Sequence, residues 1–148
     1  MQISALIAEL NPIEIPESDY LFIQDSGISN AGKGLFTAIT IYKAEIIAKF
    51  EGEILNAEES ALRKASGEDN YFMMLPDGKI LDCMHTTCFA KYANDATGLG
   101  VTQFKNNAVI LADETNAICL VAIRKIQAGE EIFCSYGARY WNKKNNIN

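Results

Sequence analysis

Two short segments hold residues that could bind a small molecule. Gly32, Lys33 and Gly34 form the first segment. Glycine lets the backbone approach a ligand closely, although the same run also suits an ordinary turn. Asn94 and Asp95 form the second segment, which offers both donors and acceptors of hydrogen bonds. The same pair is also typical of an Asx-turn, so neither segment alone indicates a site.

Tyr136 is a third candidate, because its phenol can donate and accept a hydrogen bond. A buried tyrosine with a satisfied hydroxyl is the alternative. Cys83, His85 and Cys88 lie close together, but three possible metal ligands lack a fourth, and the sequence has no paired C-x2-C spacing. We therefore expect no metal, and a loop or core role for His85.

The remaining chemistry-bearing residues are cysteines at four positions. Cys119 and Cys134 join Cys83 and Cys88. Without the spacing of a metal cluster, buried free thiols in a reducing compartment are the better interpretation.

Composition favours one intracellular domain. The 148 residues are 49% hydrophobic and 22% charged, which is ordinary for a globular protein. A net charge of -6 disfavours direct binding to nucleic acid and favours approach of a basic peptide, although it also serves solubility alone. The N-terminus does not resemble a signal peptide, and no stretch approaches the roughly 18 apolar residues of a membrane span. We expect a soluble protein, with no membrane partner and an unknown oligomeric state.

Short strands joined by glycine-rich turns predict a mainly β domain with one or two short helices. Pro12 and Pro16 interrupt regular structure in residues 1–19. One helix is expected after a cap at Asn56, ending near Gly67. A short helical turn is expected within 86–93, capped by Thr86 or Thr87. The expected strands and hairpins are 20–23, 46–50, 71–82, 108–123 and 132–136.

Four motifs in order then resemble those of the SET domain family. The stretches concerned are Gly32 to Phe36 with 43–53, then Thr87 to Asp95, then 106–108, and finally Ile126 to Gly137. The resemblance implies a SET domain over 18–141, an N-terminal extension over 1–17 and a polar tail over 142–148. It also implies the β-clip fold of small sheets, with a knot-like C-terminal threading.

The resemblance further implies a protein-lysine methyltransferase that uses S-adenosylmethionine and no metal. Its substrate would be a basic protein such as a histone tail, in the cytoplasm or a nucleus. Tyr136 would be catalytic, and Tyr71 and Cys134 would line the substrate channel. The implied cofactor-binding residues are Gly32, Lys33, Gly34, Asn94, Asp95, Tyr140 and Trp141.

The sequence departs from the family pattern at three positions. Asp95 stands where histidine is usual, Lys91 where arginine is common and Asn106 where proline is common. Cys134 stands where a larger aromatic residue is frequent, which predicts room for more than one methyl group. A non-catalytic interaction module with the same fold, and methylation of a group other than lysine, are the alternatives.

Overall fold

The elements follow one another as short strands with few helices in a computed structural model that describes residues 3–97 and 103–135. They are α1 (Ile3–Ala8), β1 (Asn11–Pro12), η1 (Glu17–Asp19), β2 (Leu21–Asp25), β3 (Lys33–Thr37), β4 (Glu45–Lys49), β5 (Glu53–Leu55), α2 (Ala57–Ala65), β6 (Phe72–Met74), β7 (Ile80–Asp82), η2 (Ala90–Tyr92), β8 (Ala108–Ala112), β9 (Ile118–Ala122) and β10 (Glu131–Ile132). The mainly β architecture expected from the sequence is confirmed.

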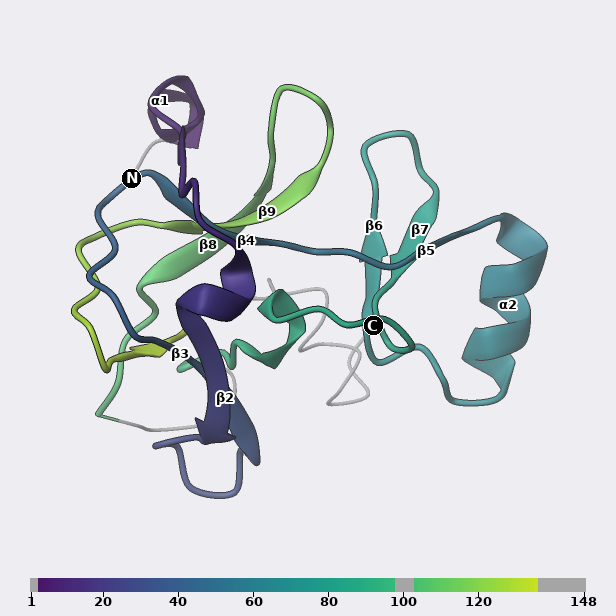
Figure 1. Ribbon diagram of the computed structural model, residues 1–148. Helices are drawn as coiled ribbons and strands as arrows, with labels where there is room; N and C mark the ends of the chain where they lie inside the picture. Colours follow the sequence, from purple (N-terminus) through teal and green to yellow (C-terminus); the bar gives the residue numbers. More distant parts are fainter. Residues whose placement is uncertain (1–2, 98–102, 136–148) are drawn as a thin grey trace.

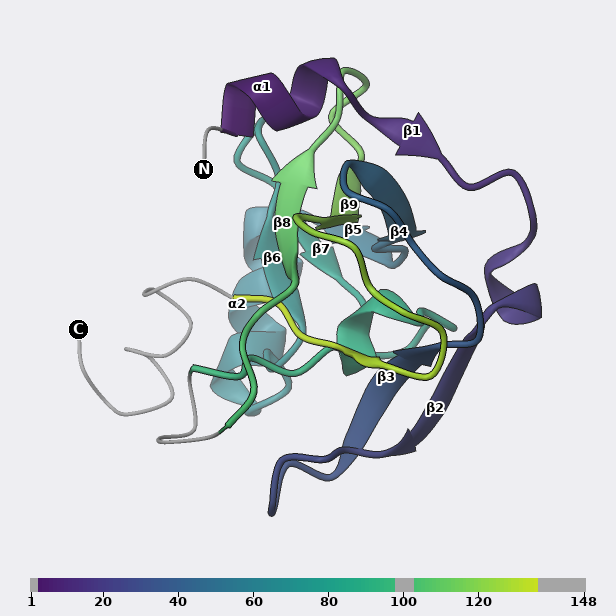
Figure 2. The same cartoon turned by 90° about the vertical axis from the view of Figure 1, so that its left-hand side faces the viewer.

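In the described part of the chain the strands form three small sheets, with strand orders β1-β4-β9-β8, β10-β3-β2 and β5-β7-β6. The third sheet and α2 form a lobe at one side of the molecule (Figure 1), while α1 lies at the opposite end from β2 and β3 (Figure 2). The segment carrying η2 passes between this lobe and the other two sheets. The η2 segment therefore lies where the sheets meet.

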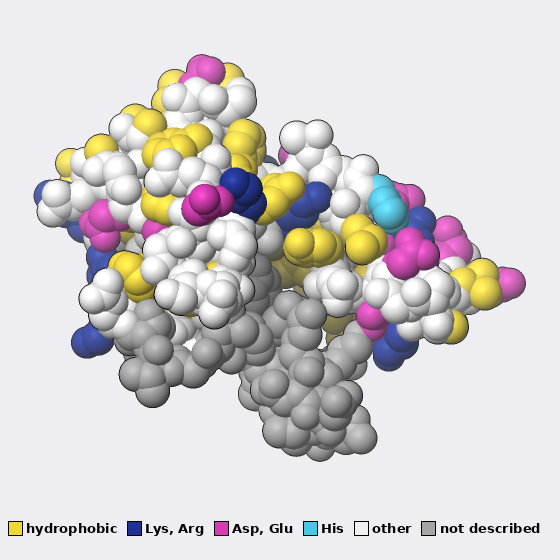
Figure 3. Space-filling view, turned by 90° about the horizontal axis from the view of Figure 1, so that it is seen from below, with side chains coloured by type: hydrophobic (Ala, Val, Ile, Leu, Met, Phe, Trp, Pro, Cys, Tyr) yellow, Lys and Arg dark blue, Asp and Glu magenta, His cyan; other side chains and the backbone are white. Residues whose placement is uncertain are grey.

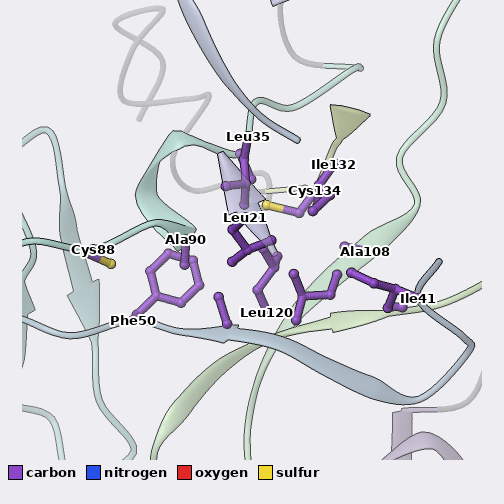
Figure 4. Packing of buried hydrophobic residues seen from close by; sticks show 14 of the residues in the cluster. Leu21, Leu35, Ile41, Phe50, Cys88, Ala90, Ala108, Leu120, Ile132 and Cys134 are labelled. Carbon is purple, nitrogen blue, oxygen red and sulfur yellow. The ribbon is translucent and has the colours of Figure 1, made fainter. Parts of the chain in front are cut away.

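The main hydrophobic core lies between the sheets and reaches the η2 segment. Leu35 of β3, Leu120 of β9 and Ile132 of β10 are fully buried in it. Ala90 and Cys134 are also fully buried in this cluster, and Figure 4 shows them in the same packed region. The core therefore fixes the strand leading to Tyr136 against the segment leading to Asn94.

Helix α2 begins and ends as the sequence predicts. Asn56 and Glu59 form a reciprocal capping box, and positive-φ Gly67 follows the last turn. Arg63 lies in the last turn of α2. Its guanidinium is 2.7 Å from the fully buried carboxylate of Asp82 and 3.0 Å from Glu53. These ion pairs attach α2 to β5 and β7.

Both expected hairpins are confirmed, as β6–β7 and β8–β9. Two local expectations need correction. The region 1–19 contains α1, in which Leu6 is buried against a second cluster that includes Leu111 and Val121. The helical turn in 86–93 is η2, which has no side-chain cap. Thr86 instead donates to the main-chain oxygen of Glu51, which lies in the connection between β4 and β5.

Candidate functional site

The Gly-Lys-Gly segment opens β3. Gly32 has a φ of +71°, and a Cβ added to it would meet no atom of the described residues within 4 Å, so these residues leave space beside its backbone. The ammonium of Lys33 pairs with Asp25 at 2.7 Å on the surface, with both side chains exposed. That pair contributes little stability. The group of Lys33 that contacts another candidate site residue is its main-chain carbonyl, which accepts from Asn94.

Gly34 allows the backbone of β3 to lie close to the side chain of Glu131. A Cβ at this position would overlap the carboxylate of Glu131. That carboxylate is buried. It accepts a hydrogen bond of 2.6 Å from the hydroxyl of Ser26 and one of 2.8 Å from the amide of Gly27. Since these bonds fix the carboxylate, it cannot yield easily to a side chain at position 34. The sequence interpretation of this glycine weighed a ligand against an ordinary turn and missed the contact with Glu131.

Asn94 joins the Gly-Lys-Gly segment to the segment Phe133–Cys134. Its side-chain amide donates to the carbonyl of Lys33 at 2.9 Å. Its own carbonyl accepts from the amide of Cys134 at 2.9 Å, and Asn94 forms a parallel bridge with Phe133. The structure thus brings together two sequence-predicted segments and Phe133–Cys134, which precede Tyr136 in the sequence.

Asp95 is buried and holds its own loop together. Its carboxylate accepts from the amide of Thr97 at 2.9 Å, the hydroxyl of Thr97 at 2.7 Å and the side-chain amide of Asn106 at 3.0 Å. Asn106 in turn accepts from the amide of Ala96 at 2.8 Å. An acidic residue suits this position because the groups directed at it are donors.

Asn107 fastens the strand that passes between the Asn94 and Ala108 segments. Its side chain accepts from the amide of Phe133 at 2.8 Å and donates to the carbonyl of Glu131 at 2.9 Å. Asn107 is 1% exposed, so both bonds are shielded from water. Residues 131–134 are held by this amide on one side and by Asn94 on the other. A family motif indicated Asn107, but nothing in its spacing revealed this pairing.

Tyr71 and Cys134 belong to the same packed region. Cys134 is fully buried in the main core, and Tyr71 packs against that core while half-buried. Burial, followed by the negative charge of Asp95, raises the pKa of the Cys134 thiol, so it remains protonated at neutral pH. Their role as channel residues stays a prediction.

Tyr71 lines a small, mainly apolar pocket of about 40 Å³. A second, more polar cavity of about 410 Å³ also has Lys91 of η2 in its wall. On the face that Figure 3 shows, apolar side chains gather between the β5–β7 lobe and the rest of the molecule, with basic side chains beside them. The residues lining the small pocket are Phe50, Asn70, Tyr71, Phe72, Met73, Cys83 and Lys91; those lining the larger one are Ile23, Met84, His85, Thr86, Thr87, Cys88, Phe89, Lys91 and Tyr92.

The cysteines and histidine take the places expected of them. All four cysteines are buried and free, and His85 is a half-exposed loop residue 3.9 Å from Glu68. The interaction between the two thiols lowers the pKa of Cys88 and raises that of Cys83, and the Cys88 thiol donates to the carbonyl of Lys49 at 3.8 Å. No group of three or more metal-ligating side chains occurs within 3–97 and 103–135.

Three of the predicted site residues lie outside the described residues. These are Tyr136, Tyr140 and Trp141. Their roles stay predictions, as do the roles of the other site residues in binding a donor. Among the described residues, no helix is long and apolar enough to cross a lipid bilayer.

Comparison with known protein families identifies the family of this chain. A family model for the SET domain matches residues 32–137, which is more than half of the chain. The chain belongs to the SET domain family. No curated protein matches its sequence.

Solved structures similar to this chain share its fold. One is a humanized mutant of the Chaetomium thermophilum Polycomb Repressive Complex 2 bound to an inhibitor, with a TM-score of 0.67 and 24% identity over 86% of this chain and 16% of that chain. An apo form of the same complex, with two mutations in Ezh2, has a TM-score of 0.68 and 25% identity over 84% of this chain and 16% of that chain. A third structure is the complex in an autoinhibited conformation bound to S-adenosylmethionine. It has a TM-score of 0.67 and 24% identity over 86% of this chain and 16% of that chain. This chain thus spans 16% of the length of those chains.

Proposed function

We propose that this chain is an S-adenosylmethionine-dependent protein-lysine methyltransferase. The hydrogen bond from Asn94 to the carbonyl of Lys33 is the observation that carries the proposal. It connects the open backbone at Gly32 to the strand that leads to Tyr136. Membership of the SET domain family and the S-adenosylmethionine reported for a similar structure support the same cofactor.

The residues present fit such a donor. No atom of residues 3–97 or 103–135 lies within 4 Å of a notional Cβ on Gly32, which leaves room beside them for the amino-acid end of the donor. The backbone of Gly32, Lys33 and Gly34, together with Asn94 and Asp95, would hold that end. Tyr140 or Trp141 would offer a flat face to the adenine. When bound, the donor supplies an electrophilic methyl group on a positively charged sulfur.

The acceptor lysine must be neutral to attack that methyl group. With an ordinary pKa near 10.4, deprotonation at pH 7 costs about 4 to 5 kcal/mol. An apolar pocket lowers the amine pKa by desolvation, so water can take the proton without a strong general base. Tyr136 would orient the amine in line with the methyl group, while Tyr71 and Cys134 would line its channel. Such alignment contributes several kcal/mol.

Net charge supports the proposed class of substrate. The chain carries a net charge of -6, which attracts a basic peptide and speeds its approach. We include a basic protein substrate such as a histone tail in the proposal. A histone substrate would place the protein in a nucleus, and another basic protein would be met in the cytoplasm.

Donor binding and methyl transfer test the proposal separately. S-adenosylmethionine should raise the melting temperature, because a ligand that binds only the folded state stabilises it by mass action. Labelled donor should then transfer label to a lysine-containing basic peptide and not to its arginine counterpart. Stabilisation without transfer to any peptide would favour an inactive interaction module, and label on another residue would exclude lysine as the acceptor.

A further inference from the structure

Lys91 lies in the wall shared by the two pockets. It belongs to η2, three residues before Asn94, and lines both the small pocket beside Tyr71 and the larger cavity beside Tyr92. A cation in this position faces the region assigned above to the acceptor lysine. Sequence comparison with the family pattern noted only that arginine is common here.

The Lys91 ammonium fastens the turn that follows β7. Its Nζ donates to the carbonyl oxygens of Cys83 at 3.2 Å, Met84 at 3.2 Å and Thr86 at 3.0 Å. Hydrogen bonds from a charged donor are among the stronger ones in proteins. One side chain therefore holds three carbonyls of the loop that connects β7 to η2.

The same ammonium lies between two aromatic rings. Its Nζ is 5.5 Å from the ring centroid of Tyr71 and 5.5 Å from that of Tyr92. Both distances fall within the range of a cation–π contact. Lys91 thereby sets the position of the Tyr71 ring against the turn at 83–86.

A fixed positive charge here also acts on any amine in the Tyr71 pocket. A neighbouring cation disfavours a second ammonium and so lowers the pKa of that amine. Six other titratable groups of the described residues line the two pockets or lie beside Cys83. They are Tyr71, Asp82, Cys83, His85, Cys88 and Tyr92. The Asp82 carboxylate is paired with Arg63, so its negative charge is compensated.

We propose that Lys91 is a positioning residue for the acceptor lysine, an inference that rests on the proposed methyltransferase function. It holds the 83–86 turn and the Tyr71 ring as one wall of the acceptor pocket. Its charge favours the neutral form of the amine bound there.

Two variants separate charge from hydrogen bonding. Lys91→Gln keeps a donor for the carbonyls but removes the charge, and Lys91→Arg keeps both. Melting temperatures with and without S-adenosylmethionine first show that each variant folds and binds the donor. We then expect the apparent pKa in the kcat/KM profile of Lys91→Gln to rise by about 0.5 to 1 pH unit, whereas Lys91→Arg stays near the native protein.

A binding measurement provides a readout independent of turnover. At neutral pH the native pocket should prefer a peptide with norleucine, which is uncharged, over the same peptide with lysine. That preference should fall about 3- to 10-fold in Lys91→Gln and persist in Lys91→Arg. Fluorescence anisotropy of labelled peptides gives the two dissociation constants.

The outcomes are distinguishable. A slower Lys91→Gln enzyme with an unshifted pH profile and an unchanged peptide preference would assign Lys91 a purely structural role and overturn the proposal. A native protein that binds the donor but methylates no lysine peptide would overturn the proposed function, and this inference with it. Shifts in both the profile and the preference, restored by arginine, support it.

Discussion

The side-chain amide of Asn94 donates a hydrogen bond of 2.9 Å to the main-chain carbonyl of Lys33, which lies 61 residues earlier in the chain. The carbonyl of Asn94 also accepts from the amide of Cys134. One residue therefore links the start of β3 to the strand that leads to Tyr136. The proposed site depends on this link, because its three parts come from distant portions of the sequence.

Replacing Asn94 by alanine should weaken donor binding more than folding. The variant loses one side-chain hydrogen bond, worth about 1 kcal/mol of stability, but keeps the main-chain bond to Cys134. We expect the affinity for S-adenosylmethionine to fall about tenfold or more, measured by calorimetry. The exposed Asn11→Ala is the matched control. Equal donor affinities in both variants would remove Asn94 from the proposed donor site.

Replacing Gly34 by alanine should destabilise the fold through Glu131. The added methyl group would overlap a carboxylate that Ser26 and Gly27 hold in place. We expect the free energy of unfolding to fall by about 1 to 3 kcal/mol. Chemical denaturation of Gly34→Ala, Glu131→Ala and the double variant gives the coupling between the two positions. Strict additivity would show that the overlap is relieved without cost.

Replacing Asn107 by alanine should lower the free energy of unfolding more than replacing any exposed asparagine by alanine. The change leaves the amide of Phe133 and the carbonyl of Glu131 without their buried partner. Two such groups should lower the free energy of unfolding by about 2 to 4 kcal/mol. Urea denaturation compares the variant with Asn11→Ala, for which we expect almost no change. A loss below 1 kcal/mol, about the value of a single ordinary hydrogen bond, would contradict the fastening role given to Asn107.

Tyr20 should make stability depend on alkaline pH. Its hydroxyl donates 2.6 Å to the carbonyl of Ile47, and burial, followed by the charges of Glu17 and Glu45, raises the pKa of Tyr20. The neutral phenol therefore stabilises the fold at pH values below about 10, and this contribution is lost as pH rises further, because the unfolded chain then releases its proton first.

Tyr20→Phe supplies the comparison for that pH dependence. At pH 8 the native protein should be more stable by about 1 to 2 kcal/mol, the cost of leaving a buried carbonyl unpaired. The difference should shrink as pH rises through 10 and beyond, as measured by denaturation at a series of pH values. A difference that stays constant up to pH 11 would show that Tyr20 ionises as it does in the unfolded chain.

The local patterns predicted elements whose causes are local. Asn56, Glu59 and Gly67 define the ends of α2 within a few residues of sequence. The two hairpins follow from alternating apolar residues around short turns. Helix α1 was missed because its stability comes from Leu6 packing against distant Leu111 and Val121, which no short window contains.

The candidate site was predictable as a set of segments but not as a set of contacts. Family-like motifs indicated Gly32–Gly34, Asn94 and the closing strand together. The partners of Glu131, Asn107 and Lys91 depend on how loops cross, and that is set by the packed core. Side chains that hold other parts of the backbone carry no periodic signal of their own.

Methyl transfer by the native chain and by Tyr136→Phe tests the proposed function most directly. Each protein is incubated with S-adenosylmethionine and a lysine-containing basic peptide, and the peptide masses are followed with time. We predict methyl additions on lysine by the native chain and a loss of rate of about tenfold or more in Tyr136→Phe, with unchanged melting temperature. Equal rates of methylation by the two proteins, or no added methyl mass with either, would contradict the account.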